Sequence, residues 1–195
     1  MRPFSYWVVA LLILSGCSVV KSAQVRDDWG TAHADKVKRL TVVVQPPPDG
    51  KQKVGEAWSR IARRYVNMKR NFLVRAELVQ VDPVALPAVC VEGTEGMLWL
   101  KPQVTPKGDG FEASVDGRLV RCADGLELWS GQAGGSFAAK DDKLIEVTAM
   151  YGKEYAPEVE PYIPLAMNLL RPLLDTLPNP VLTREEEEEK VLVDE

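Results

Sequence analysis

Few residues in this 195-residue chain could carry out catalysis. His33 is the single histidine, and it lies in a polar stretch near the amino terminus. A Ser-His-Asp triad is therefore not indicated, and neither is a zinc site built on two imidazoles. Acid–base chemistry needs two carboxylates held close together. The nearest pairs in the sequence are Glu92 with Glu95 and Glu154 with Glu158, and carboxylates in loops usually face solvent. Because no phosphate-binding glycine loop is present either, the sequence favours a binding or structural protein over an enzyme.

The charge balance argues against a nucleic-acid partner. The chain has 24 lysine and arginine residues against 28 aspartate and glutamate residues, a formal net charge of -4. Nucleic-acid-binding domains usually carry a basic surface instead. The apolar fraction of 46% is typical of a globular protein and excludes general disorder. Three cysteines cannot form a cysteine-rich zinc site without further ligands, so we expect no metal and no other cofactor.

The amino terminus, MRPFSYWVVALLILSGC, has the pattern of a secretory signal. Arg2 precedes an apolar run over residues 4–14 that is too short to cross a bilayer as a helix. The run ends in Leu14-Ser15-Gly16-Cys17, which resembles the lipobox of bacterial lipoproteins. This resemblance implies cleavage before Cys17, attachment of diacylglycerol to its thiol and acylation, for example by palmitate, of the new amino terminus. Several acyl chains anchor a protein firmly in a membrane.

The residue after the modified cysteine bears on the destination of the protein. In lipoproteins of diderm bacteria, an aspartate at this position is associated with retention in the inner membrane, and this chain has Ser18. The resemblance therefore implies a lipid anchor in the outer membrane, with the domain facing the periplasm. Inner-membrane and surface-exposed positions remain alternatives.

Two cysteines remain once Cys17 carries lipid. Cys90 and Cys122 would then lie in an oxidising compartment, where two thiols tend to form a disulfide. Such a bond would close a loop of about 30 residues and stabilise the domain by roughly 3–4 kcal/mol. The alternative is two buried free thiols on neighbouring strands. Neither cysteine has a CxxC neighbour or a histidine partner, so a catalytic thiol is not indicated.

The chain divides by composition into four segments. These are a signal peptide over residues 1–16, a lipidated tether over 17–36, one domain over 37–180 and an acidic C-terminal tail over 181–195. The tether is assigned because residues 18–36 are mostly polar and show no hydrophobic period. The tail contains the glutamate run Glu185–Glu189, which begins a helix if Thr183 and Glu186 form a capping box, and is otherwise a solvated arm.

The pattern over residues 37–180 predicts an α+β fold. A strand over 37–45, an amphipathic helix over 53–70 and a strand over 72–80 make a strand-helix-strand unit. Short strands separated by glycine-containing turns follow, and they predict an antiparallel meander. A second amphipathic helix, over residues 162–177, should pack on the sheet through its leucine face. The expected meander strands are 97–101, 111–121 and 126–131, and a further helix is expected over 141–151.

The helix over residues 53–70 has a basic outer face in a net-acidic chain. This face is a candidate partner-binding surface for an anionic polymer, a lipid headgroup or another envelope protein. Its candidate residues are Arg60, Arg63, Arg64 and Arg70. The alternative is an ordinary solvated helix face.

Three segments of the mature chain carry a second resemblance: VKRLTVVVQ, YVNMKRNFLV and VEPYIPLAMNLLRPLLDTLPNPVL. Together they resemble a family of lipoproteins from myxobacteria and spirochaetes to which no function is assigned, so the resemblance implies a lipoprotein and no specific activity. More loosely, a strand-helix-strand unit behind a lipobox is similar to lipoproteins of envelope assembly, transport and secretion machines. That similarity is one of architecture, which does not by itself give function.

These observations lead to one hypothesis and two alternatives. We expect a non-enzymatic envelope lipoprotein, held at the membrane by acyl chains on Cys17, that binds or assembles with another envelope component. The first alternative is an auxiliary subunit of a lipid or solute transporter, which predicts an apolar groove between helix and sheet. The second is a carboxylate-based enzyme, which predicts two close acids with shifted pKa values in a concave site.

Overall fold

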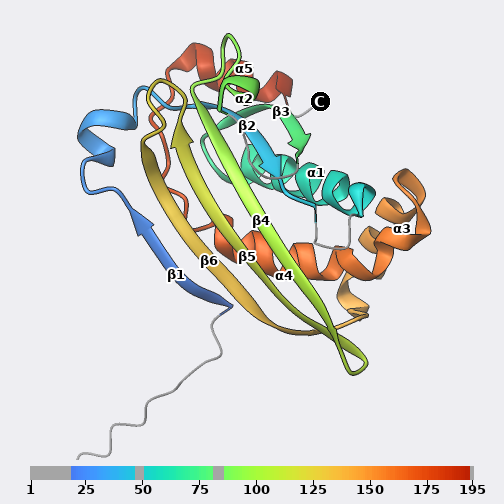
Figure 1. The fold of residues 1–195 in the computed structure, drawn as a ribbon. Coiled ribbons are helices and arrows are strands. Elements are labelled where there is room, and N and C mark those ends of the chain that lie inside the picture. The colour runs from blue at the N-terminus through green and yellow to red at the C-terminus, as the bar shows by residue number, and fades with distance from the viewer. Residues whose placement is uncertain (1–18, 47–50, 81–85, 194–195) are drawn as a thin grey trace, which may run out of the picture.

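The computed structural model describes residues 19–46, 51–80 and 86–193 (Figure 1). The signal segment and the lipobox with Cys17 lie outside the described residues. Within the described ranges, no helix is both long enough and apolar enough to cross a membrane.

Six strands form one mixed sheet in the order β1-β6-β5-β4-β2-β3. β2 runs parallel to both of its neighbours, β3 and β4, and the other pairs are antiparallel. A helix, α1, connects β2 to β3, and β4, β5 and β6 follow one another as a meander. The expected strand-helix-strand unit and antiparallel meander are therefore confirmed. The strands are β1 (Val20–Val25), β2 (Arg39–Val44), β3 (Leu73–Val79), β4 (Gly96–Lys107), β5 (Gly110–Arg121) and β6 (Glu127–Ala138).

Two amphipathic helices, α1 (Gln52–Lys69) and α4 (Ile163–Leu174), pack on one face of the sheet (Figure 1). Each helix buries an apolar stripe of the kind that its sequence predicts, such as Val54, Trp58 and Ile61 in α1. The expected C-terminal amphipathic helix is thus confirmed as α4. The other helical elements are η1 (Trp29–His33), α2 (Leu86–Val89), η2 (Asp142–Leu144), α3 (Ile145–Glu154), η3 (Pro157–Tyr162) and α5 (Arg184–Val193).

The hydrophobic core fills the layer between these two helices and the sheet. Its largest side chains include Trp58 of α1 and Trp129 of β6, both almost fully buried. Each indole N–H donates a hydrogen bond, from Trp58 to the carbonyl of Tyr162 at 3.2 Å and from Trp129 to the hydroxyl of Thr176 at 3.1 Å. Gly117 of β5 makes room for the second ring, because a Cβ there would lie 2.8 Å from Trp129.

The segment expected to be a tether belongs to the domain, which corrects the boundary at residue 37. Residues 20–25 form β1 and pair with β6, and the turn η1 follows. Trp29 and His33 in that turn are buried, and the Trp29 indole donates to the carbonyl of Asn179 at 3.3 Å. Most side chains of β1 are exposed. The sequence VKSAQV therefore lacks the hydrophobic alternation that would reveal a strand.

The expected acidic tail contains a docked helix, α5. The predicted capping box is present: the Thr183 N–H donates to Glu186 Oε2 at 2.8 Å, and the Glu186 N–H donates to Thr183 Oγ1 at 3.4 Å. Two glutamates then reach cations at the start of β2. Lys38 Nζ lies 2.7 Å from Glu186 Oε2, and Arg39 Nη2 lies 2.8 Å from Glu189 Oε2. The alternative of a solvated arm is therefore wrong for residues 184–190.

Asn67 is buried in α1, although the helical pattern places it on the outer face. Its side chain binds the backbone of Val74 in the edge strand β3. The Val74 N–H donates to Asn67 Oδ1 at 2.8 Å, and Asn67 Nδ2 donates to the Val74 carbonyl at 3.2 Å. The amide thus satisfies backbone groups that have no further strand beside them.

We expect Asn67→Ala to lower the free energy of unfolding by about 2–3 kcal/mol, because it leaves a buried N–H and a buried C=O without partners. Urea denaturation followed by circular dichroism would measure the loss. Met68→Ala is the matched control, since Met68 is the next residue of the same helix and is 67% exposed. Equal stability of the two variants would contradict this role of Asn67.

Candidate functional site: the uncovered face of the sheet

On the face of the sheet opposite α1 and α4, no helix among the described residues covers β1, β6, β5 and most of β4 (Figure 1). Side chains alternate along a strand, so Trp99 and Lys101 of β4 project to this side while Leu98 and Leu100 enter the core. The strand register aligns the exposed side chains in rows across the four strands. We call this surface the open face. It comprises Ser22, Gln24, Trp99, Lys101, Gln103, Ser114, Asp116, Arg118, Ser130 and Gln132.

Two contacts organise the centre of the open face. In one row, the Arg118 guanidinium lies over the Trp99 ring, 5.4 Å from its centroid, a cation–π geometry. In the next row, Gln132 Nε2 donates to Asp116 Oδ1 at 2.9 Å. These residues come from three different strands, so the register of β4, β5 and β6 positions them.

The open face holds two shallow hollows of about 410 Å³ and about 470 Å³. The first lies around Trp99 and Arg118, and the second lies towards the β4–β5 hairpin around Gln103 and Ser114. Amides, hydroxyls, one indole ring and charges of both signs line them. Such a surface can form hydrogen bonds and an apolar contact with a partner. Among the described residues, no group of three or more metal-ligating side chains is found.

Over β2 and the start of β4, the same side of the sheet is covered. α2 places Val89 against Val43 and Met97, and the disulfide Cys90–Cys122 joins the chain after α2 to the chain after β5. The two Cα atoms are 5.4 Å apart. The predicted pairing is thus confirmed, and the alternative of two free thiols does not hold in this structure.

The predicted basic surface on α1 faces acids of the same domain. Arg60 Nε lies 2.8 Å from Glu77 Oε1, and Arg63 Nη1 lies 3.4 Å from Glu77 Oε2. Glu77 belongs to β3, which lies beside α1 in space but follows it in sequence. One carboxylate thus compensates part of the charge of two of the four predicted arginines.

The other two arginines also have partners within the domain. Arg64 is exposed, and its Nη1 donates to the hydroxyl of Tyr151 in α3 at 3.3 Å. The Arg70 guanidinium donates to the carbonyl of Leu177 beyond α4. The four arginines therefore lie along α1 and its end as predicted, and their role in partner binding stays a prediction.

The two candidate carboxylate pairs, Glu92 with Glu95 and Glu154 with Glu158, do not form an acid–base pair at a hollow. Glu95 Oε2 accepts hydrogen bonds from the backbone N–H groups of Lys38 and Arg39, at 2.7 and 2.9 Å. Glu92 is exposed in the turn before it. Glu154 and Glu158, at the end of α3 and in η3, are exposed as well. Glu95 therefore supports the start of β2.

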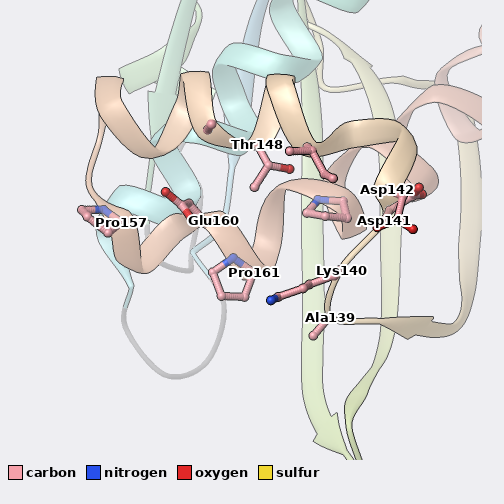
Figure 2. A pocket seen from close by; sticks show the side chains of 11 residues that line it. Ala139, Lys140, Asp141, Asp142, Thr148, Pro157, Glu160 and Pro161 are labelled. Atoms are coloured by element: carbon pink, nitrogen blue, oxygen red, sulfur yellow. The ribbon is translucent and has the colours of Figure 1, made fainter.

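A separate hollow of about 390 Å³ lies between α3 and η3 (Figure 2). Prolines of η3 and α4 line it together with Asp141, Asp142 and Glu160, and Thr148 Oγ1 is buried there with no hydrogen-bond partner among the residues that the structure describes. The transporter alternative requires an apolar groove between helix and sheet, but buried side chains fill that layer. This hollow lies outside the layer, so it is not the groove between helix and sheet that the alternative requires.

Much of the open face lies on strand extensions that the sequence does not reveal. The expected strand ends at Lys101 because proline usually interrupts a strand. β4 nevertheless continues through Pro102 and Pro106 to Lys107. β2 pairs with β4 only as far as Leu100, so the rest of β4 lies at an edge, where a missing N–H costs little.

No protein-family model matches the sequence, and no related curated protein is found. Among solved structures, the PelC dodecamer from Paraburkholderia phytofirmans is similar, with 14% identity, a TM-score of 0.43 and coverage of 74% of this chain and 91% of that chain. Lipoprotein GNA1162 from Neisseria meningitidis shows 15% identity, a TM-score of 0.37 and coverage of 60% and 97%, respectively. At these values the similarity carries no conclusion about this chain.

Proposed function

We propose that this chain is a bacterial envelope lipoprotein, anchored in the outer membrane through acyl chains on Cys17, whose domain binds another envelope component without catalysis. The lipobox Leu14-Ser15-Gly16-Cys17 supports the anchor. The disulfide Cys90–Cys122 supports export, because such bonds persist in oxidising compartments.

The open face is the observation that carries the binding role. α1 and α4 cover the opposite side of the sheet, whereas the open face presents a half-buried Trp99 under the exposed Arg118. Tryptophan and arginine are enriched among the residues that contribute most to protein–protein binding. We therefore place the main contact with an envelope protein here rather than on α1, where Glu77 already pairs with two arginines.

Site-specific photocrosslinking in intact cells tests this proposal. A crosslinking amino acid at Gln132, at the centre of the open face, should capture one envelope protein in stoichiometric amounts. The same amino acid at Arg64, on the exposed side of α1, is the matched control and should capture little. Adding Trp99→Ala to the Gln132 probe should reduce capture by more than about tenfold if the ring contributes as strongly as typical hot-spot residues do.

The outcomes separate the two surfaces and the anchor. Capture from Arg64 alone would move the binding site to the basic surface of α1, and capture from neither position would contradict a protein-binding role. Mass spectrometry of the crosslinked lipoprotein also tests the anchor, since its first peptide should begin at an acylated Cys17. An intact signal sequence with an unmodified thiol would contradict the lipoprotein assignment.

A further inference from the structure

The folded domain begins almost at the proposed lipid anchor. The Val19 carbonyl accepts a hydrogen bond from the Gly134 N–H at 2.8 Å, and the Val19 side chain packs against the core. Only Ser18 separates Val19 from Cys17. Two residues of extended chain span at most about 7 Å. Acyl chains on Cys17 would therefore hold the start of β1 close to the membrane surface.

β4, β5 and β6 extend past the level at which β1 begins (Figure 1). Val20 pairs with Ala133 of β6, and Ala133 pairs with Val115 of β5. Beyond these residues, β5 extends back to Gly110 and β6 extends forward to Ala138. At about 3.4 Å per residue, this overhang projects roughly 17 Å beyond the start of β1. We call residues 103–107, 110–114 and 134–138 the overhang.

The overhang is longer than the connection to the anchor. If the strands stood along the membrane normal, the β4–β5 hairpin would reach roughly 7 Å deeper than the anchored residue, because Cys17 precedes Val20 by three residues, which span about 10 Å of extended chain. The hairpin carries the exposed charges of Lys107 and Asp109, and charged groups are costly in hydrocarbon. The domain must therefore tilt until the start of β1 and the hairpin both lie at the bilayer surface.

The edge that joins these two points has a composition suited to that position. No charged residue occurs from Leu128 to Ala139, in a chain of which 27% of residues are charged. Past the start of β1, this edge belongs to β6, where Ser136 and Ala138 are exposed and Phe137 is half-buried. No acidic side chain in this stretch would meet the negative phosphate groups of lipids, whereas in the hairpin Lys107 pairs with Glu112 at 2.8 Å and Asp109 is exposed.

We propose that residues 134–138 of β6 and the β4–β5 hairpin form a membrane-contact surface that rests on the lipid headgroups. The inference builds on the proposed acylation of Cys17. Contact at this surface holds the strands oblique to the bilayer. α5 then lies at the end of the domain away from the membrane, and the open face is presented sideways to partners in the periplasm.

Fluorescence quenching in vesicles tests the contact surface. The full-length acylated protein is inserted into vesicles of phosphatidylethanolamine and phosphatidylglycerol that carry a headgroup-linked quencher. A fluorophore is attached at Ser136→Cys in the overhang or, as the matched control, at Glu185→Cys on α5. Both positions are exposed, and α5 and the β4–β5 hairpin lie at opposite ends of the domain (Figure 1). We expect severalfold stronger quenching at position 136, and equal or reversed quenching would overturn the proposal.

A lengthened connection tests the cause of the contact. A Gly-Ser insert of about 12 residues between Ser18 and Val19 has a mean span of roughly 20 Å, which frees the domain from the geometric constraint. Quenching at position 136 should then lose most of its excess over position 185, and an unchanged excess would overturn the tether argument. Mass spectrometry of the same sample distinguishes the two proposals. An unacylated Cys17 rejects the anchor, whereas an acylated protein with equal quenching rejects only the contact surface.

Discussion

A chain that lacks the disulfide should lose about 4 kcal/mol of its free energy of unfolding. Cys90 and Cys122 are 32 residues apart, and opening this loop returns conformational freedom to the unfolded chain. The bond also holds the end of α2, whose Val89 packs on Val43. We expect the double variant Cys90→Ser, Cys122→Ser to unfold at a clearly lower urea concentration, and chemical denaturation would measure the shift.

Two controls identify the disulfide as the cause of that shift. Dithiothreitol should destabilise the native protein to the same extent as the double substitution does. Cys17→Ser changes a thiol that lies before the first strand and should leave the urea midpoint unchanged. If dithiothreitol left the urea midpoint of the native protein unchanged, Cys90 and Cys122 would be free thiols in solution.

The second large effect is expected at α5 when the pH falls. Burial alone would raise the pKa of Glu186, but hydrogen bonds from Lys38 and the Thr183 N–H, together with the charges of Lys38 and Arg39, outweigh it and lower the pKa from 4.5 to about 2. Hydrogen bonds from arginines of β2 and β3 lower the pKa of Glu189 as well. Because both values are depressed in the folded state, docking of α5 is fully stabilised above pH 4.5 and weakens as the pH falls towards 2.

Amide hydrogen exchange, corrected for the intrinsic effect of pH, would measure this release. We expect the amides of residues 184–193 to lose their protection from exchange near pH 3, while the amides of the sheet stay protected. At pH 7, Glu186→Gln with Glu189→Gln should give the same release, because breaking partly buried ion pairs costs on the order of 3 kcal/mol. The matched control is Glu185→Gln with Glu188→Gln, which removes the same charge from exposed positions. Equal protection in the two double variants would contradict docking by these ion pairs.

The helices α1 and α4 could be predicted from the sequence because an amphipathic helix displays its buried stripe within its own residues. The capping box of α5 is equally local, since Thr183 and Glu186 lie one turn apart. The same reasoning places Asn67 on the outer face. Its burial comes from a polar contact with Val74 of a neighbouring strand, and such a contact leaves no mark on the hydrophobic pattern.

β1 and the open face depend on partners that are distant in sequence. β1 is held by backbone bonds to β6, and backbone bonds are possible for almost any sequence. The buried Trp29 is one apolar signal in residues 18–36 that points to a folded segment. The rows of side chains on the open face exist only once β4, β5 and β6 are aligned, so their proximity could not be derived from spacing along the chain.

The pairing of β1 with β6 has a consequence for the order of folding during export. A chain exported as proposed crosses the inner membrane with its amino terminus first, so β1 arrives before the strand that it needs. Its neighbour in the described sheet is β6, the last strand in the sequence, and Ala34 accepts a hydrogen bond from Val181, which is later still. Pairing between such distant segments is slow. The strand next to the lipid anchor therefore stays unpaired until nearly the whole chain has emerged. In a prematurely terminated chain, this anchored strand could not join the sheet.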